Sequence, residues 1–204
     1  VVTWVKPSAI TYGEELSNQQ LSATANVSGV FTYDPPLGKR FDVGRHSLSL
    51  IFNPDDKVNY LVVSKEVLLE VSKEVLTVSA KDALRAYGAA NPKFELEYNG
   101  VVYGETSEAL ITKPFIQTSA DEFSSAGMYD LKVLGGKSNN YDLKLKNGTL
   151  TVYKEAPEIV WEIPENIPYG TKLVDMYTAV AKMKGSEAEF KGRYKYSPSS
   201  SIVL

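Results

Sequence analysis

The 204-residue sequence contains no cysteine and a single histidine, His46. The lack of cysteine excludes disulfides, thiol nucleophiles and Cys-ligated zinc. With one histidine, only His46 could be the base of a Ser-His-Asp triad, and a zinc site would have a single nitrogen ligand. No apolar run reaches the length of a membrane-spanning helix, so the sequence predicts no transmembrane segment. The formal net charge of -3 lacks the basic excess typical of nucleic-acid-binding proteins, so we expect no nucleic-acid partner.

One stretch near the start of the chain recurs near its end with identical internal spacing. The repeated residues are Trp, Pro, Ile, Tyr, Gly and Leu, first as Trp4, Pro7, Ile10, Tyr12, Gly13 and Leu16, then as Trp161, Pro164, Ile167, Tyr169, Gly170 and Leu173. So many matches in one frame, two of them to Trp and Tyr, predict an internal repeat.

Alternation of apolar and polar residues indicates β-strands. After Gly44, the side chains of Leu48, Leu50 and Phe52 fall on one face, with polar residues between the leucines. Turn signals such as Asn-Pro-Asp-Asp at 53–56 and Asn-Gly at 99–100 separate the segments. Short strands with frequent turns predict an all-β fold built from Ig-like β-sandwich modules.

A weaker repeat relates the first part of the chain to the middle part. The pattern that begins Gly44-x-His46-x-Leu48 recurs as Gly127-x-Tyr129-x-Leu131, and the Asn-Tyr pair at 59–60 recurs at 140–141. We therefore predict three modules arranged end to end: a first, Ig-like module at 1–72, a second at 73–154 and a truncated or shortened third, Ig-like module at 155–204. The short linkers predict a semi-rigid rod. Because the chain starts on a repeat motif without Met, we expect a fragment of a longer protein.

One segment gives conflicting signals. Residues 175–184 are rich in good helix formers, whereas the corresponding residues of the first module, 18–27, alternate as a strand. The repeat favours a strand at 175–184.

The motifs resemble two kinds of bacterial repeat. The Trp-Pro-Ile-Tyr-Gly-Leu pattern, followed by Tyr33-x-Pro35, is similar to Ig-like repeats of large bacterial surface proteins. Leu-Thr-Val at 76–78, Tyr-Gly-x-x-Asn-Pro at 87–92 and Asn-Gly-Thr-Leu-Thr-Val at 147–152 resemble MBG repeats, which are mostly β and glycine-rich. The second module, at 73–154, is therefore predicted to be MBG-like. The resemblance implies an extracellular stalk or adhesion module, secreted or on the bacterial cell surface. It transfers no catalytic residue.

The candidate chemical sites have simpler structural explanations. His46 corresponds to Tyr129 in the repeat, which favours packing over catalysis. Asp55 and Asp56, with Asp34 or Asp42, could ligate calcium, but the corresponding turn of the second module has no acidic residue, which favours a solvated turn. We therefore expect no catalytic residue, no bound metal and no cofactor.

The tyrosines are the remaining candidates for ligand binding, because aromatic faces stack on sugar rings. The tyrosines of the repeated Tyr-Gly pairs, at 12, 87 and 169, are predicted to pack within the fold, as are Trp4 and Trp161. Tyr103, Tyr177 and Tyr194 are less regular in the repeat and are the candidate ligand-binding residues.

The sequence thus predicts a non-enzymatic extracellular spacer and cell-adhesion module. The alternative is a carbohydrate- or protein-binding module of a secreted or surface-anchored complex. The expected partner is a host protein, a matrix protein or a glycan. The shortened third module could also share strands with another chain, because an incomplete sandwich exposes an unpaired edge.

Overall fold

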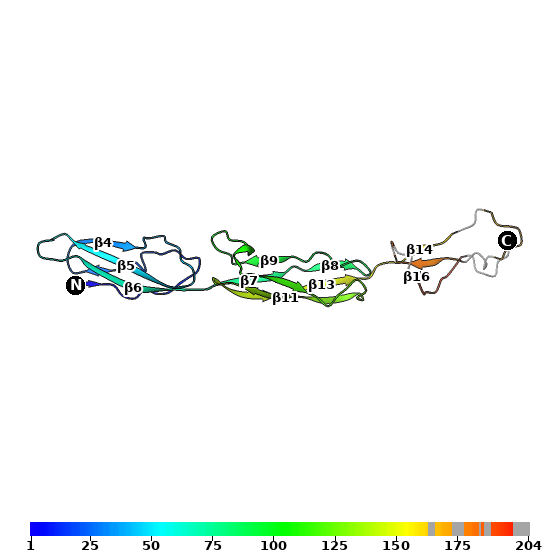
Figure 1. Cartoon of the computed structure of the whole chain (residues 1–204). Coiled ribbons are helices and arrows are strands. Elements are labelled where there is room, and N and C mark those ends of the chain that lie inside the picture. Colours follow the sequence, from blue (N-terminus) through cyan, green and yellow to red (C-terminus); the bar gives the residue numbers. More distant parts are fainter. Residues whose placement is uncertain (163–165, 173–177, 184, 186–188, 198–204) are drawn as a thin grey trace. The chain divides into compact units, whose positions relative to one another are not determined.

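The computed structural model describes residues 1–162, 166–172, 178–183, 185 and 189–197. Strands dominate these residues, and the one helical element among them is a short 3-10 turn, η1 (Ser107–Ala109) (Figure 1). The predicted all-β fold is confirmed. Contacts divide the chain into two compact units: one formed by Val1–Ala83, Lys93–Ser119 and Tyr129–Leu150, the other by Leu84–Pro92, Ala120–Met128 and Thr151–Leu204.

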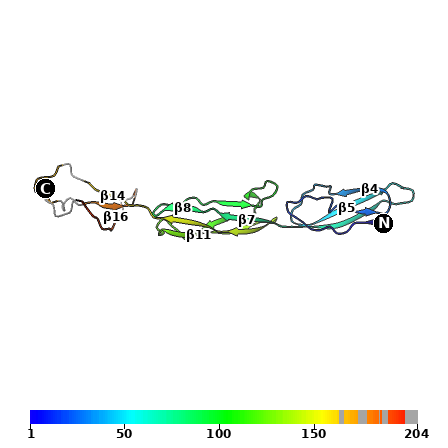
Figure 2. The same ribbon diagram turned by 180° about the vertical axis from the view of Figure 1, so that it is seen from behind.

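The first module holds two sheets. Its strands are β1 (Val2–Thr3), β2 (Ile10–Thr11), β3 (Thr24–Ala25), β4 (Gly29–Asp34), β5 (Gly44–Pro54) and β6 (Val63–Ser72). The larger sheet has the order β2-β6-β5-β4, and β1 pairs with β3 in a smaller one. Strands β4 and β5 of the larger sheet lie side by side in Figures 1 and 2. Strand β5 lies antiparallel between β4 and β6, whereas β2 joins the far edge of β6 in parallel.

The core of this module follows the predicted alternation. Leu48, Leu50 and Phe52 on β5 are at most 2% exposed. Leu69 on β6 is also fully buried. Successive side chains of a strand point to opposite faces, and Leu69 lies on the face that points into the core. The burial of these apolar side chains is the main stabilising contribution to the module.

The second module also holds two sheets. Its strands are β7 (Glu74–Ala80), β8 (Ala83–Ala86), β9 (Leu96–Asn99), β10 (Thr112–Gln117), β11 (Gly127–Lys137), β12 (Tyr141–Lys146) and β13 (Gly148–Tyr153). Their orders are β12-β7-β9 and β10-β11-β13-β8. Strand β12 runs parallel to β7, pairing Tyr141 with Glu74 at its start.

Strands β5 and β11 show the predicted repeat in three dimensions. Each has 11 residues and begins at the glycine of the repeated pattern. Leu48 on β5 and Leu131 on β11 are both fully buried. Equivalent positions of the two segments therefore have the same role in the two cores.

The third sheet contains β14 (Glu158–Val160), β15 (Val180–Lys182) and β16 (Glu189–Phe190), in that order. Strand β15 lies in the segment predicted as a strand at 175–184; residues 173–177 and 184 are outside the described residues. No sheet of the described strands combines residues from two predicted modules. The module boundaries themselves stay predictions.

An aromatic pair marks the repeat between the first and third modules. Trp4 and Tyr33 meet edge to face, with ring centroids 5.4 Å apart and planes at 68°. Trp161 and Tyr196 meet at 5.4 Å and 69°. Trp4 is 7% exposed, as predicted for a core residue, whereas Trp161 is 42% exposed.

Candidate functional site

The Tyr-Gly pair of the first module forms a tight turn directly after β2. The Glu14 N–H donates to the carbonyl oxygen of Thr11 at 2.9 Å, closing the turn. Gly13 has φ +106°, a left-handed conformation that only glycine adopts without strain. The Tyr12 N–H donates to the carbonyl oxygen of Ser72, the last residue of β6, at 2.9 Å. The turn therefore lies at the end of the module where the chain passes to β7.

The second module repeats this geometry. The Ala89 N–H donates to the Ala86 carbonyl oxygen at 3.3 Å, and Gly88 between them has φ +80°. The Tyr87 N–H donates to the carbonyl oxygen of Tyr153, the last residue of β13, at 2.9 Å. Both Tyr-Gly turns are thus fixed to the final strand of their own module.

The side chain of Tyr12 is held by residues of the second module. Its hydroxyl donates to Oε1 of Glu105 at 2.7 Å, and the hydroxyl of Tyr141 donates to Oε2 of the same carboxylate. The two tyrosine rings meet edge to face at 5.4 Å. Tyr12 is 5% exposed and Tyr141 2% exposed. One carboxylate therefore joins two buried hydroxyls that come from different modules.

Both hydroxyls are kept protonated by this environment. Burial, followed by the hydrogen bond to the Glu105 carboxylate, raises the pKa of Tyr141 to about 12. The same two causes, in the same order, raise the pKa of Tyr12 well above its ordinary value. At neutral pH both tyrosines are therefore hydrogen-bond donors to Glu105.

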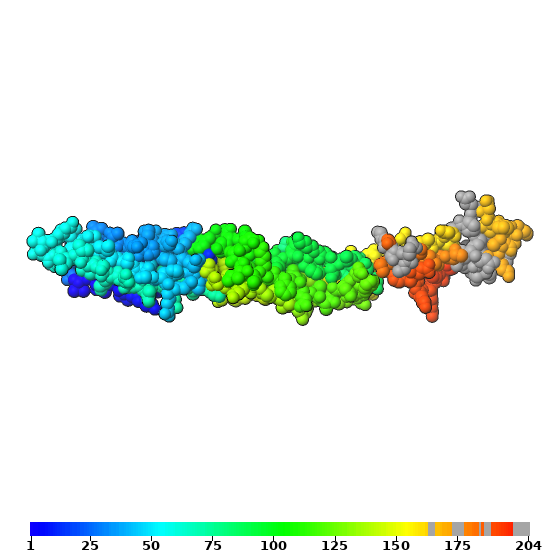
Figure 3. All heavy atoms as spheres, viewed as in Figure 1, coloured from blue at the N-terminus to red at the C-terminus, as the bar shows by residue number. Residues whose placement is uncertain are grey.

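Gly13 also permits close approach of the second module. A Cβ atom at this position would lie 2.8 Å from Cγ1 of Val102, a distance at which the neighbouring side chain must move. In the space-filling view, green atoms of the second module lie directly against blue atoms of the first (Figure 3).

Tyr103, one of the candidate ligand-binding residues, belongs to this contact. Its ring meets Tyr12 edge to face at 5.5 Å, and the Arg40 guanidinium carbon lies 4.3 Å from its centroid. Its hydroxyl donates to the carbonyl oxygen of Glu14 at 3.3 Å. The pKa of Tyr103 is raised by burial, which outweighs the lowering by Arg40. A hollow of about 220 Å³ remains here, lined by Tyr12, Arg40, Phe41, Asp42 and Tyr103.

A second set of contacts surrounds the linker. The Asn140 side chain accepts a hydrogen bond from the Val43 N–H at 3.1 Å and donates to the Asp42 carboxylate at 3.0 Å. Lys73 Nζ lies 3.7 Å from the Asp142 carboxylate. Strand β6 ends at Ser72 and β7 begins at Glu74, so Lys73 alone connects the two strands.

Two of the other residues that the sequence singled out also have defined partners. The His46 ring lies 4.6 Å from the Phe41 ring, and its Nε2 is 2.7 Å from the Asp42 carbonyl oxygen, a packing position. Tyr194 accepts a hydrogen bond from the Ala181 N–H at 2.7 Å and is 38% exposed. Tyr177 is outside the described residues. Among the described residues, no group of three or more His, Cys, Asp or Glu could hold a metal ion.

The expectation that repeated tyrosines pack within the fold is confirmed for Tyr12. It is wrong for Tyr169, which is 100% exposed. The physical reason is that Tyr12 contacts Tyr103, Glu105 and Tyr141 of the following module, so its burial depends on that module as well as on its own.

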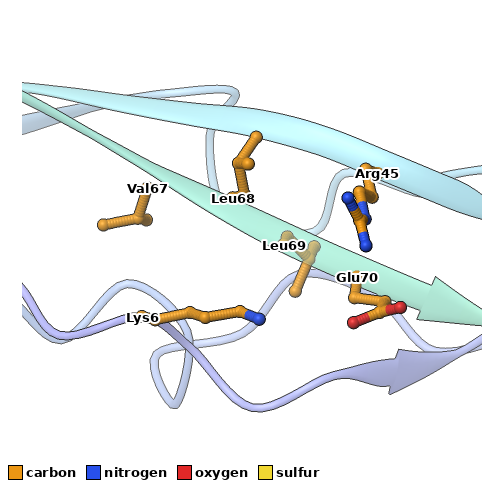
Figure 4. A pocket seen from close by; sticks show the side chains of 6 residues that line it. All are labelled: Lys6, Arg45, Val67, Leu68, Leu69 and Glu70. Atoms are coloured by element: carbon orange, nitrogen blue, oxygen red, sulfur yellow. The ribbon is translucent and has the colours of Figure 1, made fainter.

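The first module also has an open groove of about 340 Å³ that sequence reasoning missed. It is lined by Lys6, Arg45, Val67, Leu68, Leu69 and Glu70 (Figure 4). Arg45 and Glu70 are directly opposite on β5 and β6, and Lys6 reaches in from the N-terminal segment. Leu68 is 52% exposed, so the groove combines an apolar side chain with two cations and one acid.

These features define an all-β protein with sandwich-like modules, in which the first Tyr-Gly turn contacts Glu105 and Val102. Residues 76–151 match the family model of the MBG domain (YGX type), and the predicted MBG resemblance is confirmed for these residues. A search of curated proteins finds no match to the chain. Within the described part of the chain, no helix is long and apolar enough to cross a membrane.

Proposed function

We propose that this chain is a non-enzymatic spacer of a bacterial surface protein, located outside the cell, that holds an adhesive part away from the surface. The observation that carries the proposal is the shared carboxylate of Glu105, which joins Tyr12 to Tyr141 across two modules. The match of residues 76–151 to the MBG family model supports the surface location, because such repeats resemble those of bacterial surface proteins.

A spacer must resist bending between its modules. Three features of the contact supply this resistance: a single linker residue, a buried hydrogen-bonded carboxylate and close packing of Val102 on Gly13. Each edge-to-face aromatic pair contributes about 0.5–1.5 kcal/mol beyond its buried area. Modules connected by a flexible linker alone would change their relative orientation freely.

Distance measurements between spin labels test this stiffness. The chain has no native cysteine, so labels can be attached at Ser64→Cys and Lys144→Cys, both exposed positions. We expect one narrow distance distribution by double electron-electron resonance. Tyr12→Ala removes the contact with Glu105 and is expected to make the distribution at least about twofold broader.

Tyr60→Ala is the matched control, because Tyr60 belongs to the same module and is 49% exposed. It is expected to leave the distribution unchanged. A broad distribution in the unsubstituted chain would contradict the spacer proposal.

The groove at Lys6 and Arg45 favours a second candidate function, direct binding of an acidic glycan or protein. An array of glycans and matrix proteins tests it with Arg45→Ala beside a Tyr194→Ala variant. Binding lost only in Arg45→Ala would place recognition in the groove. Binding lost only in Tyr194→Ala would place it in the third module, and no binding would leave the spacer function alone.

A further inference from the structure

The third module carries the same Tyr-Gly turn as the other two. The Thr171 N–H donates to the carbonyl oxygen of Pro168 at 3.2 Å, the same spacing of donor and acceptor as in the first two turns. Gly170 has φ +88°. Positive φ at the third residue of a hydrogen-bonded turn is the type II geometry. The three turns are therefore equivalent in backbone conformation.

In the first two turns, the glycine is covered by an apolar side chain of the module that follows. A Cβ atom at Gly13 would lie 2.8 Å from Val102, and one at Gly88 would lie 2.5 Å from Sδ of Met183. In neither turn does the covering residue come from the module that forms the turn. The turn is thus a recurring contact surface for the next module.

None of the residues that the structure describes covers the third turn. A Cβ atom at Gly170 would meet none of their atoms within 4 Å, and Tyr169 is 100% exposed, whereas Tyr12 is 5% exposed. The third turn thus offers the same two groups as the first, an aromatic ring with a hydroxyl and a glycine that a neighbouring side chain can approach closely. Tyrosine at an interface supplies apolar area together with a hydroxyl that needs a partner.

We propose that the Tyr169–Gly170 turn is a docking site for an MBG domain. The loop of that domain equivalent to residues 102–105 would contact the turn, and it must not already be occupied by another Tyr-Gly turn. An apolar side chain equivalent to Val102 would pack on Gly170. A carboxylate equivalent to Glu105 would accept a hydrogen bond from the Tyr169 hydroxyl. Lys172 is exposed next to the turn and carries the charge that attracts such an acidic loop. This inference rests on the coupling of modules in the proposed function.

Disulfide trapping between two copies of the 204-residue chain tests the docking. The donor chain carries Gly170→Cys. The acceptor chain carries Val102→Cys together with Tyr12→Lys and Gly13→Lys, which uncover its 102–105 loop. Each chain has one cysteine, so a disulfide between positions 170 and 102 identifies docking. We expect the disulfide-linked dimer to form about tenfold faster with the Gly170→Cys donor than with a Gly185→Cys donor. The reason is that docking raises the effective concentration of the two thiols.

Gly185 is a matched control, because it also has positive φ and open space around its Cβ position. An acceptor that keeps Tyr12 and Gly13 is expected to react only at the control rate. A second acceptor carries Val102→Cys with Gly13→Val as the only other substitution. It keeps the test valid if the first acceptor does not fold. Equal rates for the Gly170→Cys and Gly185→Cys donors with both acceptors would overturn the proposal.

A single chain with Gly13→Cys and Val102→Cys separates this inference from the proposed function. A Cβ atom at position 13 would lie 3.2 Å from the Cβ of Val102, close to the range for disulfides. If the disulfide between positions 13 and 102 forms rapidly but no disulfide forms at position 170, only the docking inference is overturned. If the disulfide between positions 13 and 102 does not form, the coupling of the first two modules in the proposed function is contradicted as well.

Discussion

Glu105→Ala is expected to lower the free energy of unfolding by about 2–4 kcal/mol, because it leaves two buried hydroxyls without their acceptor. Tyr12 and Tyr141 are 5% and 2% exposed, so water replaces the lost carboxylate poorly. Urea unfolding followed by circular dichroism measures the change. Glu105→Gln keeps one carbonyl oxygen as an acceptor and is expected to have a smaller effect.

Glu108→Ala provides the matched control. Glu108 lies three residues further along the same loop, and its carboxylate forms an exposed ion pair with Lys113. Exposed ion pairs contribute about 0–1 kcal/mol, so this variant is expected to be close to the unsubstituted chain. Equal losses for Glu105→Ala and Glu108→Ala would contradict the role given to the shared carboxylate.

The second expected result is a loss of stability at alkaline pH. Tyrosine has an ordinary pKa of 10.0, and burial with the Glu105 hydrogen bond raises that of Tyr141 to about 12. Because the folded pKa is higher than the unfolded one, this contribution is fully present below pH 10 and is lost as the pH rises through about 12. The shift corresponds to roughly 3 kcal/mol for Tyr141 alone. Tyr12 changes stability in the same direction.

Urea unfolding at a series of pH values from neutral to strongly alkaline measures this loss. The double variant Tyr12→Phe and Tyr141→Phe removes both titrating hydroxyls, so its stability is expected to fall less steeply above pH 10. Equal slopes for the variant and the unsubstituted chain would show that these two hydroxyls are not protected from ionisation by folding.

Local sequence patterns were sufficient for the fold class and for much of the core. The alternation that places Leu48, Leu50 and Phe52 on one face depends only on strand geometry, and the structure buries all three. The repeat correctly related β5 to β11, because equivalent residues make equivalent contacts in each module. The match of residues 76–151 to the MBG family model was predicted from motifs within residues 76–152.

The contact between modules could not be predicted in the same way. Tyr12 and Glu105 are separated by 93 residues, and Tyr141 is 36 residues from Glu105. No local pattern distinguishes Glu105 from the other acidic residues of the chain. The repeated Tyr-Gly pair was visible, but its burial depends on the following module, so Tyr12 and Tyr169 have opposite exposures despite the same local sequence.

Tyr103 illustrates the same difficulty. Its irregular position in the repeat suggested a ligand-binding side chain, whereas the structure places its ring against Tyr12 and Arg40. A residue that serves a contact between two unlike modules has no repeated counterpart. Absence from the repeat is therefore compatible with a structural role as well as with ligand binding.

A double-mutant cycle between Tyr12→Phe and Glu105→Ala tests most directly whether the two modules are energetically coupled. The free energy of unfolding is measured for the unsubstituted chain, both single variants and the double variant. We expect the double variant to lose less than the sum of the single losses, with a coupling of about 1–3 kcal/mol typical of residues in one hydrogen-bond network. Additive losses, within about 0.5 kcal/mol, would contradict coupling of the modules through the Tyr-Gly turn.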